Sequence, residues 1–395
     1  MSDIIQKKEQ GINHIKKLSF NRRASSIGEN RAINYIEDQL REEGIESKRD
    51  YFEWTGPIRI LIRIGYFILI INLIIFRQIL IVIIFFIIKV ASARVKNMSL
   101  IPKEKSKNLY SLISGKKKNG EKKPIIIFTA HYDSISIILP YRAQIFIFIF
   151  YRIMSIVYIG IIVFLLFNLF TGFFDPAGNF GTFIIFDLIL SIFSIFIAIP
   201  IIIIAVKDKS SSGSIDNASG VAVILELNKL FHNYPLENYD LLFLWTGAEE
   251  WGMRGSKHFC KKYFEQFSKS YDLNKSININ IDMVGTYIGL ITKTGLFKKR
   301  KDNIFNKYFI SLARKMNINI DCYSKLFNIK SDHRTFEKIA KKKNLNFQTS
   351  CIHSDKDSKY IHSSKDTPDK CSEEILNNCI RLCYFSVKEI DSKLK

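Results

Sequence analysis

The chain has 395 residues, of which 47% are hydrophobic and 24% charged, and its formal net charge is +21. This charged fraction is normal for a soluble domain and excludes a chain made of membrane-spanning helices throughout. The Lys and Arg residues are scattered or form short runs such as 116–118, without a recognisable nucleic-acid-binding motif. We therefore expect no nucleic acid partner, and we attribute the charge to attraction towards anionic lipid headgroups.

The first strong signal along the chain is that of a helix over residues 26–43. Ser26 and Glu29 have the spacing of a capping box, in which two side chains satisfy backbone N–H groups at the start of a helix. Gly44 is typical of the residue that ends a helix. A second helix, over residues 372–394, is predicted to close the fold.

Two strand candidates follow, over residues 108–114 and 124–130. The basic loop between them contains Asn119-Gly120, which favours a tight hairpin. We therefore predict that the two strands are antiparallel neighbours. The second strand leads directly into His131, so this His lies at the edge of the sheet where the first strand begins.

A long hydrophobic insertion at 141–206 interrupts the chain after these strands. Its apolar runs, 145–170 and 183–206, are each long enough to span a bilayer, for which about 20 residues suffice. A short loop without Lys or Arg joins the two runs. We predict a transmembrane helical hairpin.

An earlier insertion, at 57–93, is less regular. Two shorter apolar runs are split by Arg77 and Gln78, and neither run alone is long enough for a comfortable span. A single tilted span and a pair of shallow or re-entrant helices both fit this pattern. Because the strands on either side of the insertion are expected in one sheet, the chain must return to the side of the membrane that it left, so we predict an even number of crossings or none. The rest of the chain suits one large domain. The predicted boundaries of this domain are 1–56, 94–140 and 207–395.

Several side chains suited to metal-dependent hydrolysis lie next to predicted strands or helices. Asp133 follows His131 by two residues on the same face of an extended chain, so it is placed to orient the His131 ring. Asp216 opens an apolar-periodic helical stretch and is expected at a strand-to-helix junction.

Two further strand candidates, 241–246 and 277–281, also end in acidic residues. The first leads to the adjacent pair Glu249 and Glu250, which suits two tasks, metal binding and proton transfer. The second ends in Asp282. Each motif alone often occurs in proteins for structural reasons. The combination of all of them in one chain indicates a functional site.

The remaining His residues divide into three kinds. His362 lies in the motif Tyr360-Ile-His-Ser-Ser-Lys-Asp-Thr-Pro-Asp369 and completes the candidate site. For His333, a role beside the site and a purely structural role both remain open. We expect surface positions for the four others, which are His14, His232, His258 and His353.

In this order, the motifs resemble those of the M28 family of zinc aminopeptidases, from about residue 25 to the C-terminus apart from the two insertions. The resemblance implies an α/β fold with a mixed sheet of the zinc-peptidase (phosphorylase/hydrolase-like) kind, here carrying two hydrophobic membrane insertions. It implies two Zn ions and a general base. The implied ligands are His131 and Asp282 for one ion, Glu250 and His362 for the other, and Asp216 between them, with Glu249 as the base.

The resemblance carries three further implications. Asp133 would act on the site through His131, the Asp216–Asn217 peptide bond would be cis, and residues 331–336 would line the substrate pocket.

We therefore predict a membrane-anchored aminopeptidase that hydrolyses the N-terminal residues of peptides with a free amino terminus. A glutaminyl-cyclase-like enzyme and a non-catalytic membrane scaffold are the alternatives. Residues 216–220 and 249–256 favour the hydrolase, because they look like its versions of these motifs. The scaffold is disfavoured because none of the ligands is lost.

The side of the membrane on which the catalytic domain lies is predicted from the charges around the long insertion. Arg142, Lys207 and Lys209 flank it on the side of the domain, whereas its far loop has no basic residue. The positive-inside rule then gives a multi-pass membrane protein with its catalytic domain in the cytoplasm. The polar start of the chain lacks a signal peptide, and the six Cys show no Cys-x-x-Cys pair, so we expect reduced, partly buried thiols.

Overall fold

The computed structural model describes residues 10–55, 103–116, 122–136, 211–294, 299–300, 303–325 and 330–394, together with single positions between 143 and 167. The predicted insertion at 57–93 and most of the one at 141–206 lie outside these residues. Across the described parts of the chain, no helix combines the length and the apolar character needed to cross a membrane.

The chain divides into two compact units. The first comprises Met1–Trp54, Lys105–Ser136 and Asp208–Lys395, and the second comprises Thr55–Glu104 and Ile137–Lys207. The candidate site described below belongs to the first unit.

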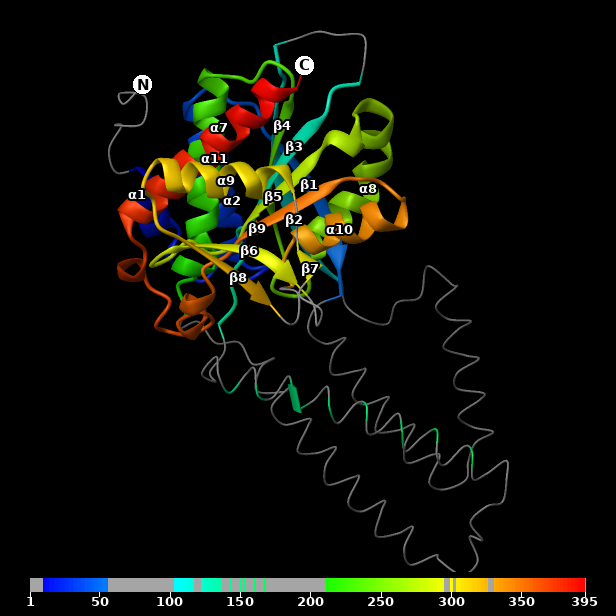
Figure 1. The fold of residues 1–395 in the computed structure, drawn as a ribbon. Coiled ribbons are helices and arrows are strands. Elements are labelled where there is room, and N and C mark those ends of the chain that lie inside the picture. Colours follow the sequence, from blue (N-terminus) through cyan, green and yellow to red (C-terminus); the bar gives the residue numbers. More distant parts are fainter. Residues whose placement is uncertain are drawn as a thin grey trace, which may run out of the picture. The chain divides into compact units, whose positions relative to one another are not determined.

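The first unit is built around a mixed sheet in which nine strands are described, in the order β1-β2-β4-β3-β5-β9-β6-β7, with β8 paired to β6 (Figure 1). The central strands β4, β3, β5 and β9 pair in parallel, and β2 is antiparallel to β4. The strands are β1 Lys48–Trp54, β2 Glu104–Ile113, β3 Ile125–His131, β4 Asp240–Thr246, β5 Ile277–Ile281, β6 Ile288–Thr294, β7 Lys299–Arg300, β8 Ile320–Lys325 and β9 Gln348–Ile352.

The predicted hairpin between β2 and β3 is wrong, because β4 lies between these two strands. Every residue of β4 is buried, so this strand needs a neighbour on each side. The start of the predicted strand 108–114 and the end of the strand 124–130 nevertheless lie at the same edge of the sheet, as predicted. Leu109, near the start of the predicted strand 108–114, and Ala130, at the end of β3, both pair with Trp245, so these two positions lie together.

Helices cover both faces of the sheet (Figure 1). Helices α1, α7, α9 and α11 pack together on one face, and α8 and α10 pack against each other on the other face. The helices are α1 Gln10–Leu18, α2 Ile27–Glu42, α7 Ser219–Asn233, α8 Arg254–Ser270, α9 Ile304–Lys315, α10 His333–Lys342 and α11 Glu373–Lys393.

The predicted first and last helices are confirmed, with one change in the cap of α2. The Glu29 N–H donates to Ser26 Oγ at 3.2 Å as expected, but the Glu29 carboxylate accepts the N–H of Ser25, at 2.8 Å, rather than that of Ser26. Gly44 follows α2 with a φ of 71°, where a glycine avoids strain. The six Cys are free and five are buried, as expected of reduced thiols.

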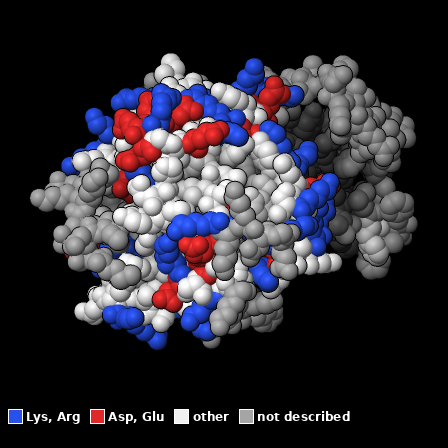
Figure 2. All heavy atoms as spheres, turned by 90° about the horizontal axis from the view of Figure 1, so that it is seen from above, with Lys and Arg blue, Asp and Glu red and all other residues white. Residues whose placement is uncertain are grey.

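Charged side chains are dispersed over one face of the molecule (Figure 2). On the face shown in Figure 2, Lys and Arg form several separate groups, and several of these groups lie beside Asp or Glu. Pairs of opposite charge at exposed positions each contribute little to stability. Burial of apolar side chains therefore carries most of the stability of this unit.

Three aromatic rings join the central strands to α7. Phe128 of β3 stacks on Phe243 of β4 with ring centroids 5.3 Å apart, and Phe231 of α7 lies 6.5 Å from Phe128 and 6.4 Å from Phe243. All three side chains are fully buried. Their packing fixes the helix that begins just after Asp216 against the strand that ends at His131.

We expect Phe243→Ala to lower the free energy of unfolding by about 3–5 kcal/mol, because it removes a buried ring and leaves a cavity. Leu112→Ala is the control. Leu112 lies opposite Leu242 on the neighbouring strand but is 49% exposed, so its truncation should change stability by less than about 1 kcal/mol. Urea unfolding followed by Trp fluorescence measures both, and equal losses would contradict this account of the core.

Candidate metal centre

The five predicted metal ligands come together at the ends of the parallel strands. His131 is the last residue of β3, Asp282 follows β5, and Asp216 lies in the turn that precedes α7. One group consists of His131, Asp216 and Asp282, and a second of Asp216, Glu250 and His362. Within each group, one potential ligand atom per residue lies within 4.8 Å of the others.

Asp216 belongs to both groups, and its two oxygens face different partners. Asp216 Oδ1 lies 3.0 Å from His131 Nε2, and Oδ2 lies 3.2 Å from His362 Nε2. Asp282 Oδ1 is 3.5 Å from His131 Nε2, and Glu250 Oε2 is 3.1 Å from His362 Nε2. The carboxylate of Asp216 is therefore shared between two sets of donor atoms.

The electrostatics of this cluster fit divalent cations. Asp216, Glu249 and Asp282 are each only 7% exposed, and carboxylates buried together are costly unless a positive charge compensates them. The Glu250 Oε1 atom is buried with no hydrogen-bond partner in the described part of the chain. Imidazole nitrogens with carboxylate oxygens are a ligand set that zinc accepts.

The two His side chains respond to the same excess of acidic groups. Burial alone would lower the pKa of His131, but its contacts with Asp133, Asp216 and Asp282 raise it well above the ordinary value. For His362, burial is likewise outweighed by Glu250 and Asp216, which raise its pKa. Both imidazoles therefore lie where positive charge is stabilised.

Asn217 holds Asp216 close to Asp282. The Asp216–Asn217 peptide bond is cis, as the resemblance implied. Asn217 Nδ2 donates to the Ile281 carbonyl at 2.9 Å, and Asn217 Oδ1 accepts the N–H of Met283 at 3.0 Å. The same oxygen accepts the N–H of a helical glycine, so one amide side chain joins the turn to both α7 and the end of β5.

The helical glycine, Gly220, allows this close approach. A Cβ at this position would lie 2.4 Å from the Ile281 carbonyl oxygen, which is closer than any side chain tolerates. A short helical turn, Ser214–Ala218, carries Asp216 into α7, and residues 211–213 before it are not a strand. The predicted strand-to-helix junction is therefore a loop-to-helix junction over the described residues.

Asp133 acts on the site differently from the prediction. The His131 Nδ1 atom lies 3.1 Å from the Asp133 main-chain carbonyl, whereas the Asp133 carboxylate is 3.7 Å away. The carboxylate instead accepts the N–H groups of Glu249, at 3.0 Å, and Glu250, at 3.3 Å. A single residue therefore fixes both the His ring and the turn that carries the two glutamates.

The turn after β4 brings its two glutamates to the cluster by a sharp reversal. Ala248 has a φ of 52° and Gly252 a φ of 98°, and the Met253 N–H donates to the Glu249 carbonyl at 2.6 Å. Burial raises the pKa of the Glu249 carboxyl well above its ordinary value. Its Oε1 atom has no hydrogen-bond partner among the described residues, so this carboxyl group is available to exchange a proton.

Sequence reasoning missed Arg22, which is completely buried beside the cluster. Its guanidinium donates to the carbonyls of Tyr132 at 2.8 Å, Ser212 at 2.8 Å and Gly213 at 2.7 Å. Burial lowers its pKa to about 10, and nearby acidic groups oppose this shift. Because its partners are all main-chain carbonyls, no side-chain pattern in the sequence reveals this role.

Asp366 was also missed, although it lies four residues after His362. It accepts the N–H of Ile215 at 2.6 Å and that of Asp216 at 3.4 Å. Burial raises its pKa to about 7. Asp366 therefore ties the loop that carries His362 to the turn that carries Asp216.

The surface positions expected for two of the other His residues are wrong. His14 and His353 are 3% and 7% exposed. His14 contacts Glu226 at 2.8 Å where α1 packs on α7, and His353 Nδ1 lies 2.8 Å from the Asp282 carbonyl. Both sit at contacts between elements distant in sequence, which a local polar context does not reveal.

Residues 331–336 lie next to the ends of the central strands. Ser331, Asp332 and His333 are fully buried. Ser331 Oγ accepts Asn280 Nδ2 at 2.7 Å, and Asp332 pairs with the Thr246 hydroxyl. Their role in lining the substrate pocket stays a prediction.

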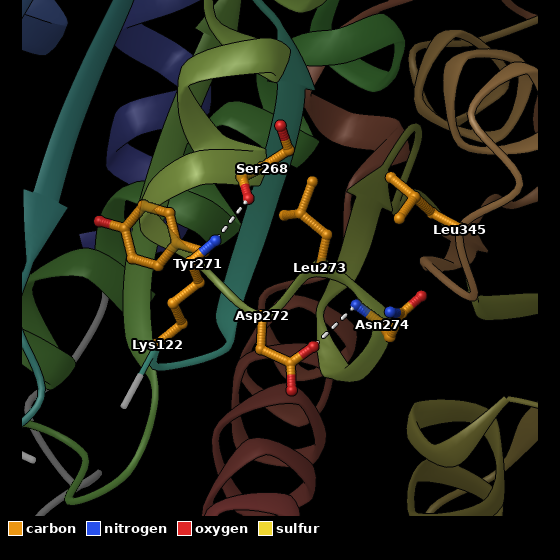
Figure 3. Close-up of a pocket in the computed structure, with 7 residues that line it drawn as sticks. All are labelled: Lys122, Ser268, Tyr271, Asp272, Leu273, Asn274 and Leu345. Carbon is orange, nitrogen blue, oxygen red and sulfur yellow. Dashed lines mark hydrogen bonds between the residues drawn. The ribbon is translucent and has the colours of Figure 1, made fainter. Parts of the chain in front are cut away.

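A separate cavity of about 380 Å³ lies at the opposite end of the strands (Figure 3). Lys122, which precedes β3, and Asn274, which precedes β5, line it, so the strands separate it from His131 and Asp282. Two hydrogen bonds in this cavity, from Lys122 Nζ to the Ser268 carbonyl at 3.2 Å and from Asn274 N–H to Asp272 at 3.1 Å, already engage its polar groups. The five predicted metal ligands lie at the other end of the sheet.

Comparison with solved structures finds the same fold in enzymes of two kinds. An aminopeptidase from Aneurinibacillus sp. strain AM-1 matches with a TM-score of 0.59 and 14% identity, over 98% of this chain and 95% of that one. A glutaminyl cyclase from an Acidobacteriales bacterium matches with a TM-score of 0.55 and 13% identity, over 97% and 94%.

In sequence, the chain is 37% identical over 76 residues to aminopeptidase YwaD of Bacillus subtilis (strain 168), which is 19% of this chain and 16% of the relative. The match thus spans less than a fifth of that relative. The model of peptidase family M28 matches residues 199–387, which contain Asp216, Glu249, Glu250, Asp282 and His362. Over these residues, the chain is similar to peptidase family M28.

Proposed function

We propose that this protein is a two-zinc aminopeptidase that removes N-terminal residues from peptides. The observation that carries the proposal is the carboxylate of Asp216, whose two oxygens face His131 and His362 at 3.0 and 3.2 Å. His131 and Asp282 would hold one ion, Glu250 and His362 the other, and Asp216 both. When bound, the ions would supply Lewis-acid activation of the scissile carbonyl and of the attacking water.

Glu249 is the general base in this proposal. It accepts a proton from the attacking water and delivers it to the leaving amine of the cleaved peptide. Burial and the lack of a hydrogen-bond partner for Oε1 among the described residues both support this role. Asp133 holds the base in place through the N–H groups of the turn.

The free amino terminus of the substrate would be held next to the two ions. In its neutral form it is a nitrogen ligand, like the imidazoles of His131 and His362, which divalent cations accept. A blocked amino terminus does not offer such a ligand. We therefore infer that peptides with a free amino terminus are the substrates.

Glutaminyl cyclisation is the second candidate, because a glutaminyl cyclase has the same fold. A peptide that begins with Gln separates the two activities. Hydrolysis consumes a water and releases free Gln with a shortened peptide, whereas cyclisation releases ammonia and keeps the peptide whole. We expect mass spectrometry to show hydrolysis, and loss of ammonia alone would contradict the proposal.

The same assay tests the base. We expect Glu249→Gln to lower turnover by roughly 10²- to 10⁴-fold while the bound metal is retained, because only the proton transfer is lost. Glu265→Gln in α8 is the matched control, since that side chain is 72% exposed and lies away from the cluster, and it should leave turnover unchanged. Near-normal turnover in Glu249→Gln would show that another group is the base.

We also propose that the enzyme is anchored in a membrane with its catalytic domain in the cytoplasm. The described positions between 143 and 167 are helical and expose a series of large apolar side chains, which supports contact with lipid. These side chains, between 51% and 70% exposed, are Phe146, Ile149, Ile153, Ile156, Val163 and Phe167. The apolar sequence of 57–93 and 141–206 and the basic residues that flank the second insertion support the same arrangement.

Reporters fused at three positions test this anchoring. We expect reporters at Met1 and in the loop 115–123 to lie on the cytoplasmic side, because both segments belong to the same unit, and a reporter at 176 to lie on the other side. Accessibility to a membrane-impermeant label in intact cells measures each position. Identical labelling of all three would contradict the hairpin, and opposite labelling of the first two would contradict the topology.

A further inference from the structure

A second pocket, of about 290 Å³, opens between α8 and α10. Its apolar wall is formed by Met253, Cys260 and Ile339, of which the first two are buried. Its remaining lining is almost entirely cationic. The basic residues that line it are Lys257, Lys261, Arg334, Lys338 and Lys342.

Most of these cations lack an acidic partner. Glu337 forms ion pairs with Arg334, at 3.1 Å, and with Lys341 outside the pocket, at 2.9 Å. Within the part of the chain that the structure describes, no salt bridge involves the four Lys residues of the pocket. Like charges that line one pocket repel one another, and an anion between them would relieve the repulsion.

The environment of Lys257 shows the same crowding. Burial, followed by the neighbouring Arg254 and Lys338, lowers the pKa of this ammonium group, and the charge of Glu249 only partly opposes this shift. Lys257 and Arg334 also lie in the first turns of α8 and α10, where the helix ends carry partial positive charge. Both helices therefore add to the positive potential of the pocket.

The pocket is also connected to the turn that carries the proposed base. Met253, in its wall, donates its N–H to the Glu249 carbonyl at 2.6 Å. Lys257 Nζ donates to the Gly252 carbonyl at 2.7 Å. A ligand in the pocket would thus contact residues bonded to the turn that holds the base.

We propose that the α8–α10 pocket binds the headgroup of an anionic phospholipid. The five basic residues of the pocket would bind a phosphate group, and its apolar wall would contact the acyl and glycerol carbons attached to that group. A free phosphate would contact the basic residues alone. An acidic side chain of a peptide would leave most of the apolar wall uncovered.

Binding of a short-chain lipid to the full chain tests this site. The purified protein in neutral-detergent micelles is titrated with dihexanoyl phosphatidylglycerol, with the phosphatidylcholine analogue and with inorganic phosphate, and the heat of binding is measured. We expect saturable binding of the phosphatidylglycerol only. Equal binding of inorganic phosphate would overturn the lipid assignment, and no saturable binding of any anion would overturn the site.

Two matched variants locate the binding. Lys261→Gln, Lys338→Gln and Lys342→Gln together remove three exposed charges from the pocket and should weaken binding by about 10- to 100-fold. The triple change Lys307→Gln, Arg314→Gln and Lys315→Gln removes three exposed charges from α9 and should change it less than about twofold. Equal effects would mean that only the net charge of the protein attracts the lipid.

A further measurement tests whether the pocket binds an acidic side chain of a peptide substrate instead of a lipid. The KM for peptides with Glu or Gln after the N-terminal residue is compared between the wild type and the pocket variant. We expect the same KM ratio in both proteins. A rise in KM confined to the Glu peptide, with lipid binding unchanged, would assign the pocket to acidic substrates instead. Lipid binding needs no turnover, so it can succeed or fail independently of the proposed peptidase activity.

Discussion

The burial of several carboxylates around one shared aspartate is the constraint on which the rest of this structure depends. Asp216 places its two oxygens 3.0 and 3.2 Å from two different His side chains, and Glu250 and Asp282 complete the two sets. Such a concentration of negative charge is stable only with compensating positive charge. The same carboxylates would bind the metal ions of the proposed reaction and would destabilise the folded chain if left uncompensated. Bound divalent cations would supply the positive charge that they need.

The surrounding residues keep these carboxylates together mainly through main-chain hydrogen bonds. Asn217 joins the turn of Asp216 to the end of β5, and Asp133 holds the N–H groups of both glutamates. Asp366 and Arg22 hold the loops on either side. The parallel strands bring the ligands to one edge, as in other open α/β sheets, and these four side chains set the final distances.

The sequence predicted those parts of the molecule that depend on local patterns. The strands that precede His131 and Asp282 were recognisable because they are continuous apolar runs, and the order of the polar residues after them predicted the cluster. The pairing of β2 with β4 was not predicted, because β4 lies between β2 and β3 and is buried on both faces, which the Asn119-Gly120 turn signal does not encode. Arg22 and Asp366 bond to the main chain, and the fold alone brings their partners near them.

Counting the bound metal tests the central claim most directly. Protein freed of metal by chelation is titrated with Zn²⁺, and the tightly bound ions per chain are measured by elemental mass spectrometry after dialysis. The account predicts two ions for the wild type, one for Glu250→Gln, and loss of both tight sites for Asp216→Ala, because the Asp216 carboxylate serves each set of donors. A wild type that binds a single ion, or an Asp216→Ala variant that still binds two, would contradict it.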